Sequence, residues 1–101
     1  MARTTQLRTY QIAEGRLDDF VDGWRAAVVP LRKRFGFHVQ EAWVDRTGSL
    51  FVWLVSYDGP EGFEARDRAY YASLDRDRLD PDPAGLIVSS EHRFVEPVAL
   101  S

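Results

Sequence analysis

The chain has 101 residues, but it contains no cysteine, only one methionine and only two histidines. Without cysteine, disulfides, thiolate zinc sites and a cysteine nucleophile are all excluded. The longest unbroken apolar run, Leu50–Val55, falls far short of the roughly 20 residues that span a membrane. The first residues also lack the apolar block of a signal peptide. We therefore expect a cytoplasmic protein with no membrane partner.

Positive charge is scarce and is carried almost entirely by arginine. The chain has 13 basic and 16 acidic residues, which gives a net charge of −3. The only tight basic cluster is Arg32-Lys33-Arg34, and we expect it at the end of a helix, where cations meet the negative end of the helix dipole. An acidic chain with one short basic run makes a poor phosphate binder, so no nucleic-acid partner is expected.

Several catalytic signatures are also missing. No glycine-rich phosphate loop and no nucleophile elbow is present. The set His38, Glu41 and Asp45 has the residue types of a metal site, but alternation along a strand spreads it over both faces. We therefore expect neither a metal nor a cofactor.

The strongest pattern that is present is the helical spacing between Leu17 and Phe35. Gaps of three and four residues place the apolar side chains on one helix face. Pro30 lies inside this pattern and removes one backbone hydrogen bond, so we expect a kink there and an end at Gly36. The residues on this face are Leu17, Phe20, Val21, Trp24, Val28, Leu31 and Phe35.

A strand is predicted before this helix, over Thr5–Ile12. Alternation places Gln6, Arg8, Tyr10 and Ile12 on one face of it. The arginine is conspicuous, because a guanidinium on a buried face must be paired. Asp67, Glu91 or a ligand carboxylate are the expected partners, and a simple salt bridge at the edge of a barrel is the alternative.

Two strands, 37–45 and 50–57, flank Thr47-Gly48 and are predicted to form a hairpin. With a two-residue loop, Val44 lies opposite Phe51 and His38 lies opposite Tyr57. Both faces of this hairpin are rich in apolar side chains. Because one helical layer covers only one face, we expect a second copy of the chain to cover the other.

A second helix is predicted to begin at Pro60, with Phe63, Asp67, Tyr70 and Leu74 on its inner face. A charged loop, 75–85, and a last strand over 86–98 follow it. The order strand, helix, strand, strand, helix, strand is that of the α+β ferredoxin-like fold, in a single domain over residues 1–101.

A further pattern extends along nearly the whole chain. Its features are the first strand with Gly15 after it, the first helix with Trp24 and Pro30-Leu31, then Gly36-Phe37, Trp43, the strand 50–57 with Asp58, and the helix with Arg66 and Arg68. This combination resembles the NIPSNAP family. This resemblance implies a dimeric α+β barrel, with a pocket between the sheet and the helices of each subunit.

That barrel group includes cofactor-independent oxygenases, haem-degrading enzymes, isomerases and cyclases, so the resemblance does not set the reaction. In position, Arg8, Tyr57 and Asp67 resemble the working residues of some haem-degrading and quinone-forming members. The residue types differ at all three positions, which argues against haem degradation.

From the residues themselves, the candidate catalytic groups are Arg8, His38 and His92. The arginine would stabilise an oxyanion and a histidine would move a proton. The alternative for each histidine is a local hydrogen bond or a strand cap, and the face of His92 is not fixed by alternation. The candidate ligand-binding residues are Tyr10, Trp53, Tyr57, Asp67 and Tyr70.

Two functions remain open at this point. In the first, the dimer binds a small planar or aromatic metabolite, or transforms it without a cofactor. In the second, it is a non-catalytic interaction protein with a filled barrel interior. A pocket of about 300 Å³ or more that holds Arg8 and a histidine would favour the first function. An interior packed solid by Phe51, Trp53 and Tyr57 would favour the second.

Overall fold

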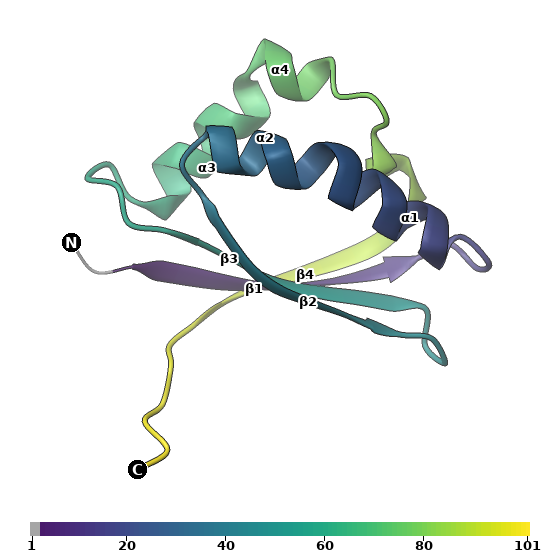
Figure 1. Ribbon diagram of the computed structural model, residues 1–101, viewed down its shortest axis with the longest axis horizontal. Coiled ribbons are helices and arrows are strands. Elements are labelled where there is room, and N and C mark those ends of the chain that lie inside the picture. The colour runs from purple at the N-terminus through teal and green to yellow at the C-terminus, as the bar shows by residue number, and fades with distance from the viewer. Residues whose placement is uncertain (1–2) are drawn as a thin grey trace.

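A computed structural model describes residues 3–101, so the first two residues of the predicted domain lie outside the described part. The elements follow the predicted order (Figure 1). They are β1 (Thr4–Ile12), α1 (Leu17–Gly23), the π-helix η1 (Trp24–Val28), α2 (Val29–Arg34), β2 (His38–Asp45), β3 (Leu50–Tyr57), α3 (Phe63–Ala72), α4 (Leu74–Asp77), the 3₁₀-helix η2 (Pro83–Leu86) and β4 (Ile87–Val95).

The four strands form one antiparallel sheet in the order β2-β3-β1-β4. The helices form a single layer on one face of this sheet, and the other face carries no helix (Figure 1). After β4 the C-terminal segment leaves the sheet on the side away from the helices. The ferredoxin-like α+β fold predicted from the sequence is therefore confirmed.

The central strand β1 alternates as predicted. Gln6, Arg8, Tyr10 and Ile12 are all buried beneath the helices, and the residues between them are more exposed. β1 lies between β3 and β4, so its inward-facing side chains reach the middle of the interior. This placement buries a charged residue at the centre of the fold.

The first helix runs through the proline, with one local change. α1 passes into the π-helix η1, in which the Val29 N–H donates to the carbonyl of Trp24 five residues earlier. Pro30 then stands at the start of α2. A π-turn loosens the helix where proline has no N–H and would crowd the preceding turn. The predicted disturbance at Pro30 is a π-turn, and the apolar face continues through Leu31.

The hairpin between β2 and β3 has the predicted register near its turn, where Val44 pairs with Phe51. Between Val39 and Ala42 the register shifts by one residue. As a result His38 lies opposite Ser56, and the predicted pairing of His38 with Tyr57 is wrong. A bulge adds one residue to one strand, and every side chain beyond it then changes face.

The second helix begins later than predicted and ends earlier. Gly62, with φ of 89°, precedes the first helical residue Phe63, so Pro60 lies in the turn before the helix. At the other end Ser73 is extended, and its hydroxyl accepts from the Arg76 N–H to cap the short helix α4. Leu74 therefore starts a new helix and is 64% exposed, so its predicted place on the inner face is wrong.

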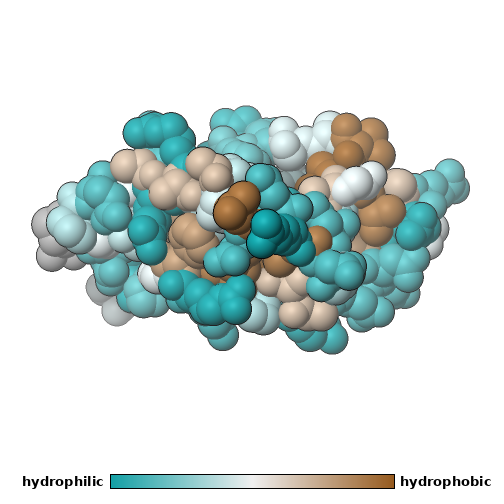
Figure 2. Space-filling model, turned by 90° about the horizontal axis from the view of Figure 1, so that it is seen from above, coloured by the Kyte–Doolittle hydropathy of each residue, from teal (hydrophilic) through white to brown (hydrophobic). Residues whose placement is uncertain are grey.

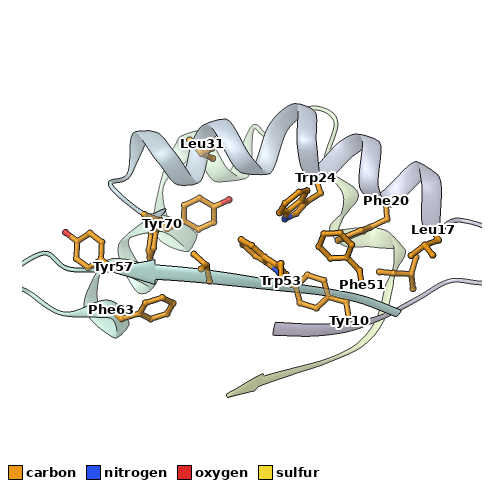
Figure 3. Packing of buried hydrophobic residues seen from close by; sticks show 13 residues of the cluster. Tyr10, Leu17, Phe20, Trp24, Leu31, Phe51, Trp53, Tyr57, Phe63 and Tyr70 are labelled. Atoms are coloured by element: carbon orange, nitrogen blue, oxygen red, sulfur yellow. The ribbon is translucent and has the colours of Figure 1, made fainter. Parts of the chain in front are cut away.

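The interior between the helices and the sheet is built mainly from aromatic rings (Figure 3). The indole of Trp24, which projects from η1, lies above the indole of Trp53 on β3, and the two ring centroids are 5.5 Å apart. The solvent side of the helices is mostly hydrophilic, with hydrophobic residues in small groups (Figure 2). No helix within residues 3–101 is long and apolar enough to cross a membrane.

Candidate functional site

Two buried arginines share one carboxylate at the centre of the molecule. Arg8 from β1 is 0% exposed and Arg32 from α2 is 1% exposed. Each places a guanidinium nitrogen on a different oxygen of Asp67 from α3, at 3.0 Å for Arg8 and 2.6 Å for Arg32. The carboxylate therefore joins the sheet to both helices. Asp67 is the partner predicted for Arg8, whereas Glu91 lies opposite Thr9, on the other face of the sheet.

Two neutral side chains complete this cluster. The hydroxyl of Tyr71 accepts a hydrogen bond from Arg8 at 2.9 Å and another from Arg32 at 3.2 Å. The Gln6 side-chain oxygen accepts from Nε of Arg8 at 2.7 Å. Arg8 is thus bound through all three of its nitrogens. Arg32 is bound through its two terminal nitrogens only.

Aromatic faces supply the rest of the surroundings of Arg32. Its guanidinium carbon lies 3.9 Å from the ring centroid of Tyr70 and 4.7 Å from that of Phe37. Such contacts stabilise a cation through the negative face of the ring. They compensate in part for the second buried positive charge, which the single negative charge of Asp67 leaves unbalanced.

Local helix geometry explains why Arg32 points inward. A π-turn holds more residues per turn than an α-helix, so the residues after it are rotated relative to those before it. The turn over Trp24–Val28 therefore brings Arg32 toward the face that carries Trp24. Arg32 lies in the last turn of α2 with Lys33 and Arg34, as predicted, but it is buried, whereas Lys33 and Arg34 are exposed.

A cavity of about 120 Å³ lies beside this cluster, between the sheet and the helices. Aromatic rings from β1, η1, β3 and α3 form most of its wall. Of the two arginines in the cluster, only Arg32 lines the cavity. The segment over η2 closes another side. The lining residues are Tyr10, Phe20, Trp24, Val28, Arg32, Trp53, Tyr70, Tyr71, Arg76, Pro83, Ala84 and Ile87.

Residues that line the cavity carry four buried polar atoms without a hydrogen-bond partner among the described residues. These atoms are Nε1 of Trp24, Nε1 of Trp53, Nε of Arg32 and the hydroxyl of Tyr70. Figure 3 shows the Tyr70 hydroxyl pointing toward the space beside the two indoles. The one other such atom among the described residues is Oγ of Ser56. Ser56 lies between Val55 and Tyr57 on β3, and its side chain is on the opposite face of the sheet. Because buried polar groups are nearly always paired, this concentration sets the cavity apart from the rest of the interior.

The two histidines lie in different surroundings. His92 is directly opposite Arg8 in the β1–β4 ladder, and its ring centroid is 6.3 Å from that of Tyr10. Partial burial lowers the pKa of His92 below its ordinary value, and the charge of Arg8 lowers it further. His38 stands at the start of β2, where its Nε2 lies 3.4 Å from a carboxylate oxygen of Asp58. Both side chains are more than 40% exposed, so this contact lies near the surface, and His38 does not line the cavity.

The structure brings together most of the residues that the sequence suggested as ligand-binding. Tyr10, Trp53 and Tyr70 line the cavity, and Asp67 anchors Arg32 beside it. Tyr57 does not line the cavity; its ring packs on Phe37 and its hydroxyl donates to Glu61 at 2.7 Å. The roles assigned to Arg8, His38 and His92 stay predictions.

Sequence reasoning missed Arg32 and Trp24 as parts of the site. Arg32 is four residues after Val28, and that spacing was the available signal that it borders the inner face. Tyr71 is four residues after Asp67 on α3, so both reach the same cluster. No group of histidine, aspartate and glutamate that could hold a metal ion occurs within residues 3–101.

The NIPSNAP family model matches residues 5–101. The chain belongs to the NIPSNAP family. No curated protein matches it in sequence. Among solved structures, an uncharacterised NIPSNAP domain protein from Burkholderia xenovorans is similar, with a TM-score of 0.80 at 18% identity over 97% of each chain. A NIPSNAP protein of unknown function from Agrobacterium tumefaciens gives a TM-score of 0.83 at 15% identity, over 98% of this chain and 91% of that one.

The fold also extends beyond NIPSNAP proteins. A candidate antibiotic biosynthesis monooxygenase from Nitrosomonas europaea gives a TM-score of 0.62 at 8% identity, over 98% of this chain and 93% of that chain. At such identities the similarity shows the shared fold and leaves the chemistry open. This NIPSNAP protein must therefore be interpreted from its own residues.

Removal of the shared carboxylate should cost much of the stability. In the variant Asp67→Asn two buried guanidiniums would face each other without a counter-charge, so we expect a loss of about 3–5 kcal/mol in the free energy of unfolding. Denaturant unfolding measures it. The control is Asp19→Asn, which breaks an exposed pair with Arg16 and should cost less than about 1 kcal/mol. Equal losses for the two variants would contradict the role of Asp67.

His92 should make stability fall as the solution becomes mildly acidic. Its pKa is lower in the folded state, so the unfolded chain takes up the proton first as pH falls through about 6.5. The stabilisation is complete above that pH and is lost below it. Denaturant unfolding above and below this pH measures the effect. The free energy of unfolding should change less between the two pH values in His92→Gln than in the unaltered protein. An NMR titration with the His92 pKa above 6.5 would contradict this assignment.

Proposed function

We propose that this NIPSNAP protein binds a small planar molecule, about the size of one ring, in the cavity between sheet and helices. The observation that carries this proposal is that residues of the aromatic wall contain four buried polar atoms without a partner: two indole N–H groups, one guanidinium N–H and one hydroxyl. A ligand with polar atoms in the cavity would give these groups partners. A pocket with apolar walls and a few convergent polar groups is typical of small-molecule sites.

The size of the cavity limits the ligand. An apolar cavity of about 150 Å³ accommodates benzene, so about 120 Å³ suits a single small ring or a shorter planar molecule. This is smaller than the pocket of about 300 Å³ or more, holding Arg8 and a histidine, that we required from the sequence for a small-molecule function, and neither Arg8 nor a histidine lines it. The guanidinium in its wall is that of Arg32, whereas Arg8 is held by Gln6, Tyr71 and Asp67. The proposal therefore covers binding and assigns no reaction.

We also propose that two copies associate through the sheet face that carries no helix. Leu7, Val52 and Leu54 lie on that face and are only partly buried, and Leu7 pairs directly with Leu54. Trp43 on the edge strand β2 is 47% exposed. A second copy on this face would bury these side chains, as the sequence pattern led us to expect.

A second candidate function rests on a specific observation. Outside the cavity the interior is filled, with Phe51 at 1% and Tyr57 at 9% exposure. A dimer that serves only in protein interactions needs no larger pocket than this. The two candidates share the dimer and differ in whether the cavity takes a ligand.

Ligand binding should raise the melting temperature, because only the folded state holds the cavity. We expect a thermal-shift panel of phenol, benzamide and benzoate to contain at least one stabilising compound. Tyr70→Phe should weaken that effect. Without ligand, the variant should be at least as stable as the unaltered protein, because it removes an unpaired buried hydroxyl.

The matched control is Tyr57→Phe, which removes a hydroxyl that donates to Glu61 away from the cavity. It should leave the ligand-induced shift unchanged. If no compound of single-ring size stabilises the protein, the binding proposal fails and the interaction protein is favoured. An equal loss of the shift in both tyrosine variants would place the ligand outside this cavity.

The dimer should depend on the open sheet face. We expect sedimentation of the unaltered protein to give a dimer and Leu54→Arg to give a folded monomer, because a charge cannot be buried unpaired in the interface. Leu74→Arg is the control, since Leu74 is an exposed leucine on α4. A well-folded monomer of the unaltered chain at high concentration would contradict the dimer.

A further inference from the structure

We propose that the ligand of this cavity is a small planar monoanion, a carboxylate or an enolate, whose negative charge lies beside Arg32. This inference rests on the proposed function and adds the charge and hydrogen-bonding character of the ligand. It is carried by two independent features of the site, namely its charge balance and the kind of polar group left without a partner.

The charge balance of the site is positive. Arg8 and Arg32 are buried and share the single carboxylate of Asp67. The other arginine that lines the cavity, Arg76, is paired with Asp82 at 3.0 Å and brings no excess charge. Within residues 3–101 no other carboxylate lies within salt-bridge distance of Arg8 or Arg32. One buried positive charge is therefore left over, and a buried charge is costly until it is paired.

The unpartnered groups are donors. An indole N–H and the Nε–H of an arginine donate and cannot accept, and three of the four unpartnered atoms at the cavity are of these kinds. The fourth is the hydroxyl of Tyr70. Burial raises the pKa of Tyr70, although Arg32 opposes this, so the hydroxyl keeps its proton and can also donate. A ligand rich in acceptors satisfies them all, and water satisfies some of them without supplying a negative charge.

The geometry around Arg32 also suits a planar anion. The Arg32 guanidinium lies over the rings of Tyr70 and Phe37, and its terminal nitrogens are bound to Asp67 and Tyr71. Its Nε–H is the donor without a partner. Planar anions match the planar geometry of a guanidinium and form strong, charge-assisted hydrogen bonds with it. The aromatic walls contact the apolar part of the same ligand.

Calorimetric titration with benzoate and benzamide tests the inference, because the two probes have nearly the same shape and differ in charge. We expect benzoate to bind at least about tenfold more tightly to the unaltered protein. In Arg32→Met the preference should vanish. The pair of Arg8 and Asp67 stays intact in this variant, and the buried cluster becomes neutral.

Arg66→Met is the matched control. Arg66 is a nearby arginine that donates to the carbonyl of Phe35 and does not line the cavity, so its loss should leave the benzoate preference unchanged. Equal binding of both probes to the unaltered protein would overturn the anion proposal while leaving the binding proposal in place. The same holds if Arg32→Met keeps the preference. If neither probe binds, the anion proposal fails, and the binding proposal fails with it when phenol does not stabilise the protein either. The comparison on the unaltered protein decides the matter even if Arg32→Met does not fold.

Discussion

The structure depends on one carboxylate that binds two buried arginines. Asp67 joins β1, α2 and α3 by holding Arg8 on one oxygen and Arg32 on the other. Packing of aromatic rings alone would hold the helices on the sheet, but it would not fix the positions of the polar side chains between them. The shared carboxylate fixes the position of both guanidiniums and leaves one positive charge without a counter-ion. That excess charge is hard to explain as a device for stability, because two buried cations on one anion cost more than a neutral pair.

The helix irregularity and the charged cluster belong together. Pro30 is accommodated by the π-turn that precedes it, and the same turn rotates Arg32 toward the interior. A regular α-helix would place this arginine nearer the edge of the inner face. The unpaired donors of Trp24, on the same turn, and of Trp53, beneath it, then lie along the cavity that Arg32 reaches. The π-turn, a local irregularity of the helix, thus positions polar groups within an aromatic core.

Much of the fold follows from spacing in the sequence, and less of the site does. Strict alternation predicted the buried face of β1, including Arg8, and helical spacing predicted the face with Trp24 and Leu31. The position of His38 was missed, because the bulge in β2 changes which face each side chain takes and leaves no mark in the pattern. Arg32 was missed because it stands in a run of cations that the helix dipole already explained. Its burial depends on a π-turn and on a partner 35 positions away.

The most direct test of the account is the energetic coupling between Asp67 and Arg32. Unfolding free energies of Asp67→Asn, Arg32→Met and the double variant form a double-mutant cycle. The account predicts that Arg32→Met restores part of the stability lost in Asp67→Asn, because it removes one of two buried cations that have lost their counter-ion. Strictly additive effects of the two substitutions would contradict it.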